Sequence, residues 1–304
     1  MDQESLFVLQ GYLASIVASF LWGLSPLLID RIKWSSYTIT LIRNLSTLSI
    51  VSLIMIIMGK TVVVKLEILI LLMILGLTGP GLADQLFVES IKLIGVNMAT
   101  ILSYTYVFWA SYMAHIAALE RISIYDIAGS IITFTGLVIG LSNRLNTNVD
   151  KKYLIGVIYS LVSGFFWGIA TIISRIMVLN LDPLVIVFFR SISALLLMIL
   201  LITLRHCFYL NLNRQVFSIY HVLITRDFLL VSTSGLLSFL VAYVSFLTGL
   251  AFLGVVIPSI ITLFSPIITL ILSKYVKKYT ISREVLISIV IILIGLFIAS
   301  VKYF

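Results

Sequence analysis

Ten long apolar runs follow one another along this chain, separated by short polar stretches. They cover residues 11–30, 37–58, 68–91, 97–118, 124–142, 154–176, 184–204, 227–250, 255–274 and 282–301. Each run is close to the ~20 residues that an α-helix needs to cross a bilayer. The pattern therefore predicts an all-α integral membrane protein with ten transmembrane helices.

The composition supports this prediction. Hydrophobic residues make up 61% of the 304 residues, charged residues only 11%, and the mean hydropathy is +1.21. Soluble domains carry about 25% charged residues, so this chain could not cover a water-exposed surface. We expect a multi-pass protein of the plasma membrane, surrounded by the lipid bilayer.

The net charge of +8 does not change this picture, because the Lys and Arg residues are scattered over short polar stretches. Nucleic-acid binding requires a concentrated basic face, so we expect no nucleic-acid partner. The single cysteine, Cys207, cannot form an internal disulfide. The sequence has no metal-ligand cluster and no glycine-rich phosphate loop, so we expect no metal and no cofactor.

The first five runs and the last five share residues at nearly constant spacing. At an offset of 145, Gly11, Ser15, Phe20, Trp22 and Gly23 recur as Gly156, Ser160, Phe165, Trp167 and Gly168. At an offset of 147, Arg43 recurs as Arg190. At an offset of 159, Gly76, Ala83, Gly95, Ser123 and Gly136 recur as Gly235, Ala242, Gly254, Ser282 and Gly295. The change to 159 falls in the polar stretch RHCFYLNLNRQVFSIYHVLITR, and loops tolerate insertions. We infer two copies of one unit, over 11–142 and 154–301.

Five spans in each copy is an odd number, so the second copy enters the membrane from the opposite side. This predicts a 5+5 inverted-topology repeat, an architecture typical of secondary transporters. The two halves can rock about a central site and expose it to each side in turn. We expect spans one, three and four of each half to form the cavity, and spans five and ten to be peripheral.

Several motifs resemble those of the EamA-domain transporters of the drug/metabolite transporter superfamily. They are FLWG and FFWG in the first span of each half, a lone Arg early in the second span, ESIKLIG and TGLAFLG, and ALERIS before the glycine-containing fifth span. Half two also has Pro266 in its fourth span, where half one has Val107. The resemblance covers residues 11–301 and implies transport of small organic solutes such as amino acids or metabolites, by an exporter or permease and not an enzyme.

Asp84 is the acidic residue closest to the middle of a span. It lies about four residues past the centre of the third run, hence ~6 Å from the midplane, and Gly79 and Pro80 interrupt the same helix. A carboxylate at this depth costs about 2.5–3.5 kcal/mol on insertion scales and marks a bundle interior or a cavity. We expect Asp84 to bind a cationic group of the solute or to carry a proton. The alternative is a protonated Asp that bonds to a neighbouring helix.

Arg43 and Arg190 lie about six residues into their helices, roughly 9 Å deep. At this depth an Arg side chain can extend to the headgroups or bond to a neighbouring helix, so we interpret both as structural intramembrane charges. Trp22 and Trp167 lie in the middle of a helix, away from the membrane interfaces where Trp is enriched. We therefore expect both tryptophans to line the cavity.

Tyr104 and Tyr106 of the fourth span, with Tyr243, Pro258 and Ser265 of the other half, complete the predicted substrate-binding residues. Together they would form an aromatic wall with a few hydrogen-bonding groups, which suits an organic solute. Aromatic residues are equally common as packing elements, so each of these assignments has a structural alternative.

Two other classes of protein remain open on this sequence. A membrane-embedded lipid-modifying enzyme would need converging nucleophile, base or metal ligands. His115 and Glu120 are five residues apart, which does not place them on one helical face, and we interpret them as interfacial. A channel would show rings of like residues, whereas Asp84 is present in one half only.

The orientation in the membrane is contested. With a cytoplasmic N-terminus, five Lys and Arg residues would be cytoplasmic and thirteen would lie outside. The positive-inside rule therefore favours both termini outside, whereas the family resemblance implies both inside. The oligomeric state, monomer or homodimer, is also open.

Overall fold

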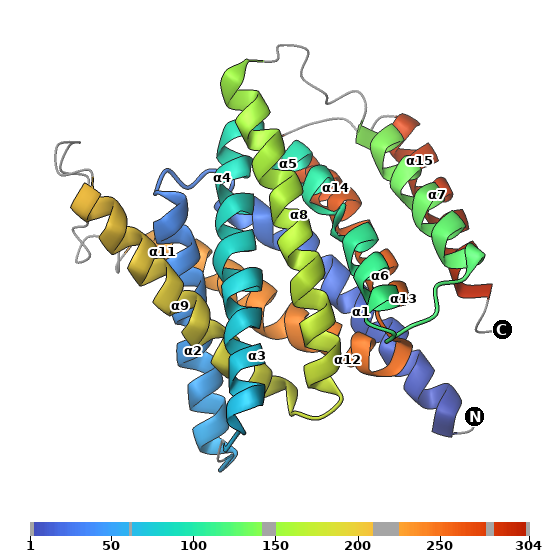
Figure 1. Cartoon of the computed structure of the whole chain (residues 1–304). Coiled ribbons are helices and arrows are strands. Elements are labelled where there is room, and N and C mark those ends of the chain that lie inside the picture. Colours follow the sequence, from blue (N-terminus) through green and yellow to red (C-terminus); the bar gives the residue numbers. More distant parts are fainter. Residues whose placement is uncertain (1–2, 61–62, 142–149, 209–224, 278–282, 302–304) are drawn as a thin grey trace.

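The structure is a computed structural model, and it describes all residues except 1–2, 61–62, 142–149, 209–224, 278–282 and 302–304 (Figure 1). The first half contains α1 (Gln3–Ile29), α2 (Ser36–Ile57), α3 (Leu66–Gly76), the π-helical segment η1 (Leu77–Ala83), α4 (Asp84–Ile94), α5 (Val96–Ser103), α6 (Tyr106–Ile116) and α7 (Ile124–Leu141). The second half contains α8 (Lys151–Val178), α9 (Pro183–Phe208), α11 (Arg226–Gly235), the π-helical segment η3 (Leu236–Ala242), α12 (Tyr243–Leu253), α13 (Val256–Thr262), α14 (Phe264–Lys277) and α15 (Arg283–Ser300).

Seven helical segments of the described chain, three of which join consecutive elements, are long and apolar enough to cross a membrane. They are Gln3–Ile29, Ser36–Ile57, Leu66–Ile94, Lys151–Val178, Pro183–Leu204, Arg226–Leu253 and Val256–Ser273. They correspond to the first three runs of half one and the first four of half two. The predicted count of ten is therefore not confirmed, and the 5+5 arrangement stays a prediction.

The fourth run, over 97–118, shows one physical reason for the lower count. It is divided into α5 and α6, because the chain turns at Tyr104 and Thr105. There the Tyr104 amide still donates to Thr100, but the Thr105 amide donates to the carbonyl of Leu102, a tighter turn than the α-helix. Each piece is too short to span the bilayer alone.

The two halves repeat the same local structure. Each has a seven-residue π-helical segment after a glycine, Gly76 or Gly235, and each following helix ends at a glycine with positive φ. These two glycines, Gly95 and Gly254, have φ values of 81° and 80°, a left-handed backbone that favours glycine. In η1, Pro80 has no amide hydrogen to donate, so the regular α-helical bonding is interrupted there.

The most extensive helix packing joins one half to the other. Helix α1 packs against α12 and α14 in the way that α8 packs against α4 and α6, while α2 packs against α9 and α7 against α15. Figure 1 shows α7 and α15 side by side at one edge of the bundle, as expected for peripheral helices. Exchanging the halves therefore reproduces the contacts, as a duplicated unit would.

Glycines make this packing close. A Cβ atom on Gly235 would lie 2.5 Å from the carbonyl oxygen of Arg43, and one on Gly76 would overlap the carbonyl oxygen of Arg190. In each half, this glycine is thus in close contact with the arginine-bearing helix of the other half. These contacts fix the backbones from which both arginine side chains extend.

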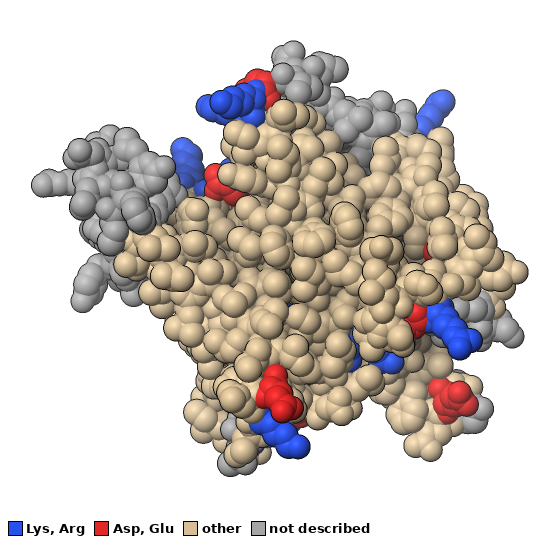
Figure 2. Space-filling view, in the orientation of Figure 1, with Lys and Arg blue, Asp and Glu red and all other residues tan. Residues whose placement is uncertain are grey.

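The outer surface is apolar over most of its area. Exposed side chains on three different helices include Leu13, Ile158 and Leu196, each more than half exposed. In Figure 2 the middle of the visible face is largely free of charge, and the charged atoms gather near the ends of helices. This surface is suited to lipid contact.

Candidate substrate cavity

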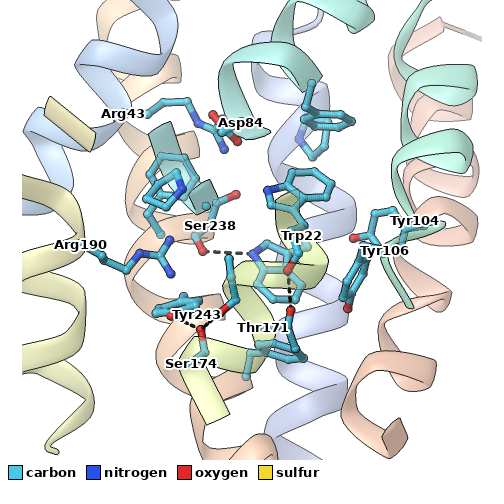
Figure 3. Close-up of a pocket in the computed structure, with 18 residues that line it drawn as sticks. Trp22, Arg43, Asp84, Tyr104, Tyr106, Thr171, Ser174, Arg190, Ser238 and Tyr243 are labelled. Atoms are coloured by element: carbon cyan, nitrogen blue, oxygen red, sulfur yellow. Dashed lines mark hydrogen bonds and ion pairs between the residues drawn. The ribbon is translucent and has the colours of Figure 1, made fainter. Parts of the chain in front are cut away.

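A cavity lies between the two halves, with a volume of about 770 Å³ that includes the open solvent at its mouth. Eighteen described residues line it (Figure 3). Seven pairs of them occupy equivalent repeat positions: Trp22 and Trp167, Pro26 and Thr171, Arg43 and Arg190, Gly79 and Ser238, Pro80 and Phe239, Asp84 and Tyr243, and Phe87 and Phe246. The cavity is thus built from the same positions of both copies.

Aromatic rings form much of the wall. The Trp167 ring lies 5.1 Å from that of Phe87 and 6.4 Å from those of Tyr104 and Tyr106, measured between centroids. On the other side, the rings of Trp22 and Phe246 are 4.9 Å apart. Such rings offer a large apolar surface to a solute.

Hydrogen bonds between the halves hold two of these rings. The Trp22 indole nitrogen donates to the carbonyl oxygen of Ser238 in η3, at 3.1 Å. The Tyr106 hydroxyl lies 2.5 Å from that of Thr262 in α13. Both rings come from half one, and both are fixed by half two.

Arg43 and Asp84 form an ion pair in the cavity wall. A guanidinium nitrogen of Arg43 donates to a carboxylate oxygen of Asp84 at 2.5 Å, and each side chain is about 96% buried. The Arg43 guanidinium also lies 4.3 Å from the ring centroid of Phe239. Because both charges are removed from water, each depends on the other for compensation.

Arg190 has a different partner. Its guanidinium lies 3.3 Å from the ring centroid of Tyr243, which occupies the repeat position of Asp84. The Tyr243 hydroxyl is 2.6 Å from that of Ser174. Arg190 is only 5% exposed, and among the described residues no carboxylate pairs with it. Cation–π stacking stabilises such a cation without neutralising it.

Six of the eight predicted substrate-binding residues line this cavity: Trp22, Asp84, Tyr104, Tyr106, Trp167 and Tyr243. The other two, Pro258 and Ser265, lie elsewhere. Pro258 is buried in α13 near Gly249, and Ser265 donates to the backbone oxygen of Ser19 at 2.8 Å. The ninth run thus supplies no lining residue among those described, although we expected it to form part of the wall.

The second span of each half contributes a residue that the sequence interpretation did not place in the cavity. We expected Arg43 and Arg190 to be structural charges, with extension to the headgroups as one role, and the structure directs both guanidinium groups inward. A usable signal was present, because a charge at equivalent depth in both copies points to a shared interior position. The polar residues Thr171, Ser174 and Ser238 carried no such signal.

The described residues contain no group of three or more His, Cys, Asp or Glu side chains placed to hold a metal ion. Among the described residues that line the cavity, the charged side chains are those of Arg43, Asp84 and Arg190. Together with the rings, they make a site that can bind a small organic molecule through one polar end. The cavity therefore has the features of a solute-binding site.

Two copies of one helical unit around a shared cavity are typical of membrane transporters. The sequence model of the EamA-like transporter family matches residues 9–141 and again residues 154–301. The chain therefore belongs to the EamA-like transporter family, as its motifs predicted.

The fold is also known from experiment. A solved crystal structure, described only as that of a protein, matches with a TM-score of 0.77 at 16% sequence identity, over 96% of this chain and 98% of that one. At this identity the likeness shows the fold alone. A comparison with curated proteins found no match.

Proposed function

We propose that this chain is a secondary transporter of the plasma membrane that carries small organic solutes by alternating access. The observation that carries the proposal is the position of the cavity, which is lined by equivalent residues of both copies. Inverted repeats that enclose a site can rock against each other and open it to either side. The transporter is an exporter or permease, with Trp22, Asp84, Tyr104, Tyr106, Trp167 and Tyr243 in contact with the solute.

The cavity wall supports a binding role for organic solutes. Most ligand pockets are apolar and contain a few fixed polar groups, and this cavity combines aromatic rings with three charged side chains. The interrupted helices α3–η1–α4 and α11–η3–α12 both border it. Discontinuous helices at a repeat interface are typical of transport sites.

Solute counterflow in proteoliposomes tests this function. Proteoliposomes that contain the purified full chain and are loaded with a metabolite mixture should exchange at least one labelled solute in a saturable way. Ala170→Phe places a ring in the cavity from α8 and should abolish this exchange, because Ala170 lines the cavity. Ile158→Phe is the matched control, since Ile158 lies on the same helix and is 51% exposed.

Two results would contradict the proposal. One is a folded Ala170→Phe variant that exchanges solute as fast as the unmodified chain. The other is turnover of lipid by the reconstituted protein without any solute flux, which would indicate a membrane-embedded enzyme.

A further inference from the structure

The charges that line the cavity do not balance. Among the described lining residues, Arg43 and Arg190 are cationic and Asp84 is anionic. Asp84 is held by Arg43 at 2.5 Å, whereas Arg190 stacks on the neutral ring of Tyr243. The cavity therefore carries one uncompensated positive charge.

Arg190 is fixed in this position by its helix. The backbone of α9 at Arg190 packs directly on Gly76, where a Cβ atom would overlap the Arg190 carbonyl oxygen and lie 2.5 Å from the Cβ atom of Ser193. The Arg190 side chain is buried and borders the cavity. The cation is thus presented to a solute, not to the bilayer.

The guanidinium also has an unused donor. The Arg190 Nε atom is buried and, like the Nε atom of Arg43, has no hydrogen-bond partner among the described residues. An arginine carries five N–H donors in a planar fork that matches a carboxylate or a phosphate oxygen pair. A buried cation without a counter-charge is costly, and a bound anion would remove that cost.

We propose that the cavity binds small organic monoanions, with the anionic group against Arg190 and the apolar body against the aromatic wall. The inference rests on the proposed transport function and narrows its solute class. A monoanion neutralises the single excess charge. A cation or a zwitterion would place an ammonium group in a cavity whose one carboxylate already pairs with Arg43. A carboxylate and a singly charged phosphate ester share this chemistry.

Ligands that share a phenyl body and differ in charge test the proposal by isothermal titration calorimetry on the detergent-purified full chain. The panel is phenylacetate, methyl phenyl phosphate (a singly charged phosphate diester), 2-phenylethylamine, phenylalanine and 2-phenylethanol, with sodium chloride as the inorganic anion. Phenylacetate should bind more tightly than the amine, the amino acid and the alcohol. Comparison with methyl phenyl phosphate shows whether the anionic group is preferred as a carboxylate or as a phosphate.

The repeat supplies a matched pair of variants. Tyr243→Asp places a carboxylate opposite Arg190, as Asp84 is placed opposite Arg43, and it should weaken phenylacetate binding about 10- to 100-fold, the value of one charged hydrogen bond. Tyr243→Asn removes the same ring without adding charge and should keep the preference for the anion. Arg190→Gln should abolish that preference, and Leu196→Ala, a change on the lipid-facing side of α9, should have no effect.

The inference is overturned if 2-phenylethylamine or phenylalanine binds more tightly than both organic anions, or if folded Arg190→Gln keeps the anion preference. Binding of chloride alone, or of no ligand in the panel, overturns it as well. These failures differ from failure of the transport function, because counterflow of a cationic or neutral solute would leave the proposed function intact. Absence of any counterflow would remove the function itself.

Discussion

The two halves of the cavity wall differ in the residue that faces the arginine common to both halves, which is Asp84 in the first half and Tyr243 in the second. In the first half, Arg43 on α2 faces Asp84, and the two charges cancel. In the second half, Arg190 on α9 faces Tyr243, and the charge remains. The duplicated scaffold thus places a guanidinium in each half, while the residue that follows the π-helical segment decides whether it is available. Binding chemistry can diverge at one position without a change in the fold.

The largest effect is expected from removing the negative charge of the Arg43–Asp84 ion pair. Asp84→Asn should lower the free energy of unfolding by about 3–5 kcal/mol, because it leaves Arg43 buried without a counter-charge. It should also abolish gradient-driven uptake. Equilibrium unfolding in mixed micelles and uptake into proteoliposomes measure the two effects.

The control is the double variant Arg43→Gln/Asp84→Asn, which removes both charges and should recover most of the lost stability. Tyr243→Asn at the equivalent position should cost less than Asp84→Asn. If Asp84→Asn is as stable as the unmodified chain and transports at the same rate, the two regions do not differ in the way described.

The next largest effect concerns the packing that both regions share. Gly76→Ala and Gly235→Ala should each lower the free energy of unfolding by about 1–3 kcal/mol, because the added methyl group meets a backbone carbonyl of the opposite half. Gly79→Ala is the matched control, since its Cβ would lie 3.4 Å from that of Ala170. Thermal unfolding of the three variants under one condition measures the difference, and equal losses would refute the packing role.

A smaller effect separates the ring of Tyr243 from its hydroxyl. Tyr243→Phe removes the bond to Ser174 and should cost about 1 kcal/mol of stability. The Ser174 hydroxyl keeps its bond to the Ala170 carbonyl, at 2.6 Å, so no polar group is stranded. Because Arg190 and its charge are unchanged, the charge preference in calorimetry should not change. A changed preference would show that the Tyr243 hydroxyl contributes to it.

The smallest effect is expected from an ion pair outside the cavity. Lys60 pairs with Asp182 between the end of α2 and the start of α9, and the two side chains are 28% and 38% exposed. Lys60→Gln should lower the free energy of unfolding by about 0.2–1 kcal/mol, and the difference should shrink at high salt. A loss as large as that of Asp84→Asn would mean that burial is not what separates these pairs.

The sequence predicted seven spans that the structure contains, the duplication and six residues of the cavity lining, because these depend on local patterns. Hydropathy and spacing do not give the direction in which a helix turns a given side chain. The positions of Arg43 and Arg190 along their helices could therefore be read from the sequence, but the inward direction of their side chains was not predicted. For the same reason Pro258 and Ser265, which face neighbouring helices, could not be separated from true lining residues.

Long-range partners were equally hidden. Glu120 follows α6 and was interpreted as an interfacial residue. In the structure its carboxylate accepts hydrogen bonds from the amides of Val255 and Val256 at the start of α13, at 2.8 and 3.3 Å. These amides lie about 135 positions away in sequence, and hydropathy and spacing do not reveal a contact between residues so far apart. Only the three-dimensional packing brings the two together.

The packing of each half mainly against the other has a consequence for biosynthesis. The ribosome delivers α1 to α7 before any of their principal partners exist, so these helices are surrounded by lipid until α8 to α15 follow. Contacts of this kind are distant in sequence, and they form late. The Arg43–Asp84 pair is an exception, because both residues belong to the half that is made first. Both members of this ion pair are therefore present before the second half is made.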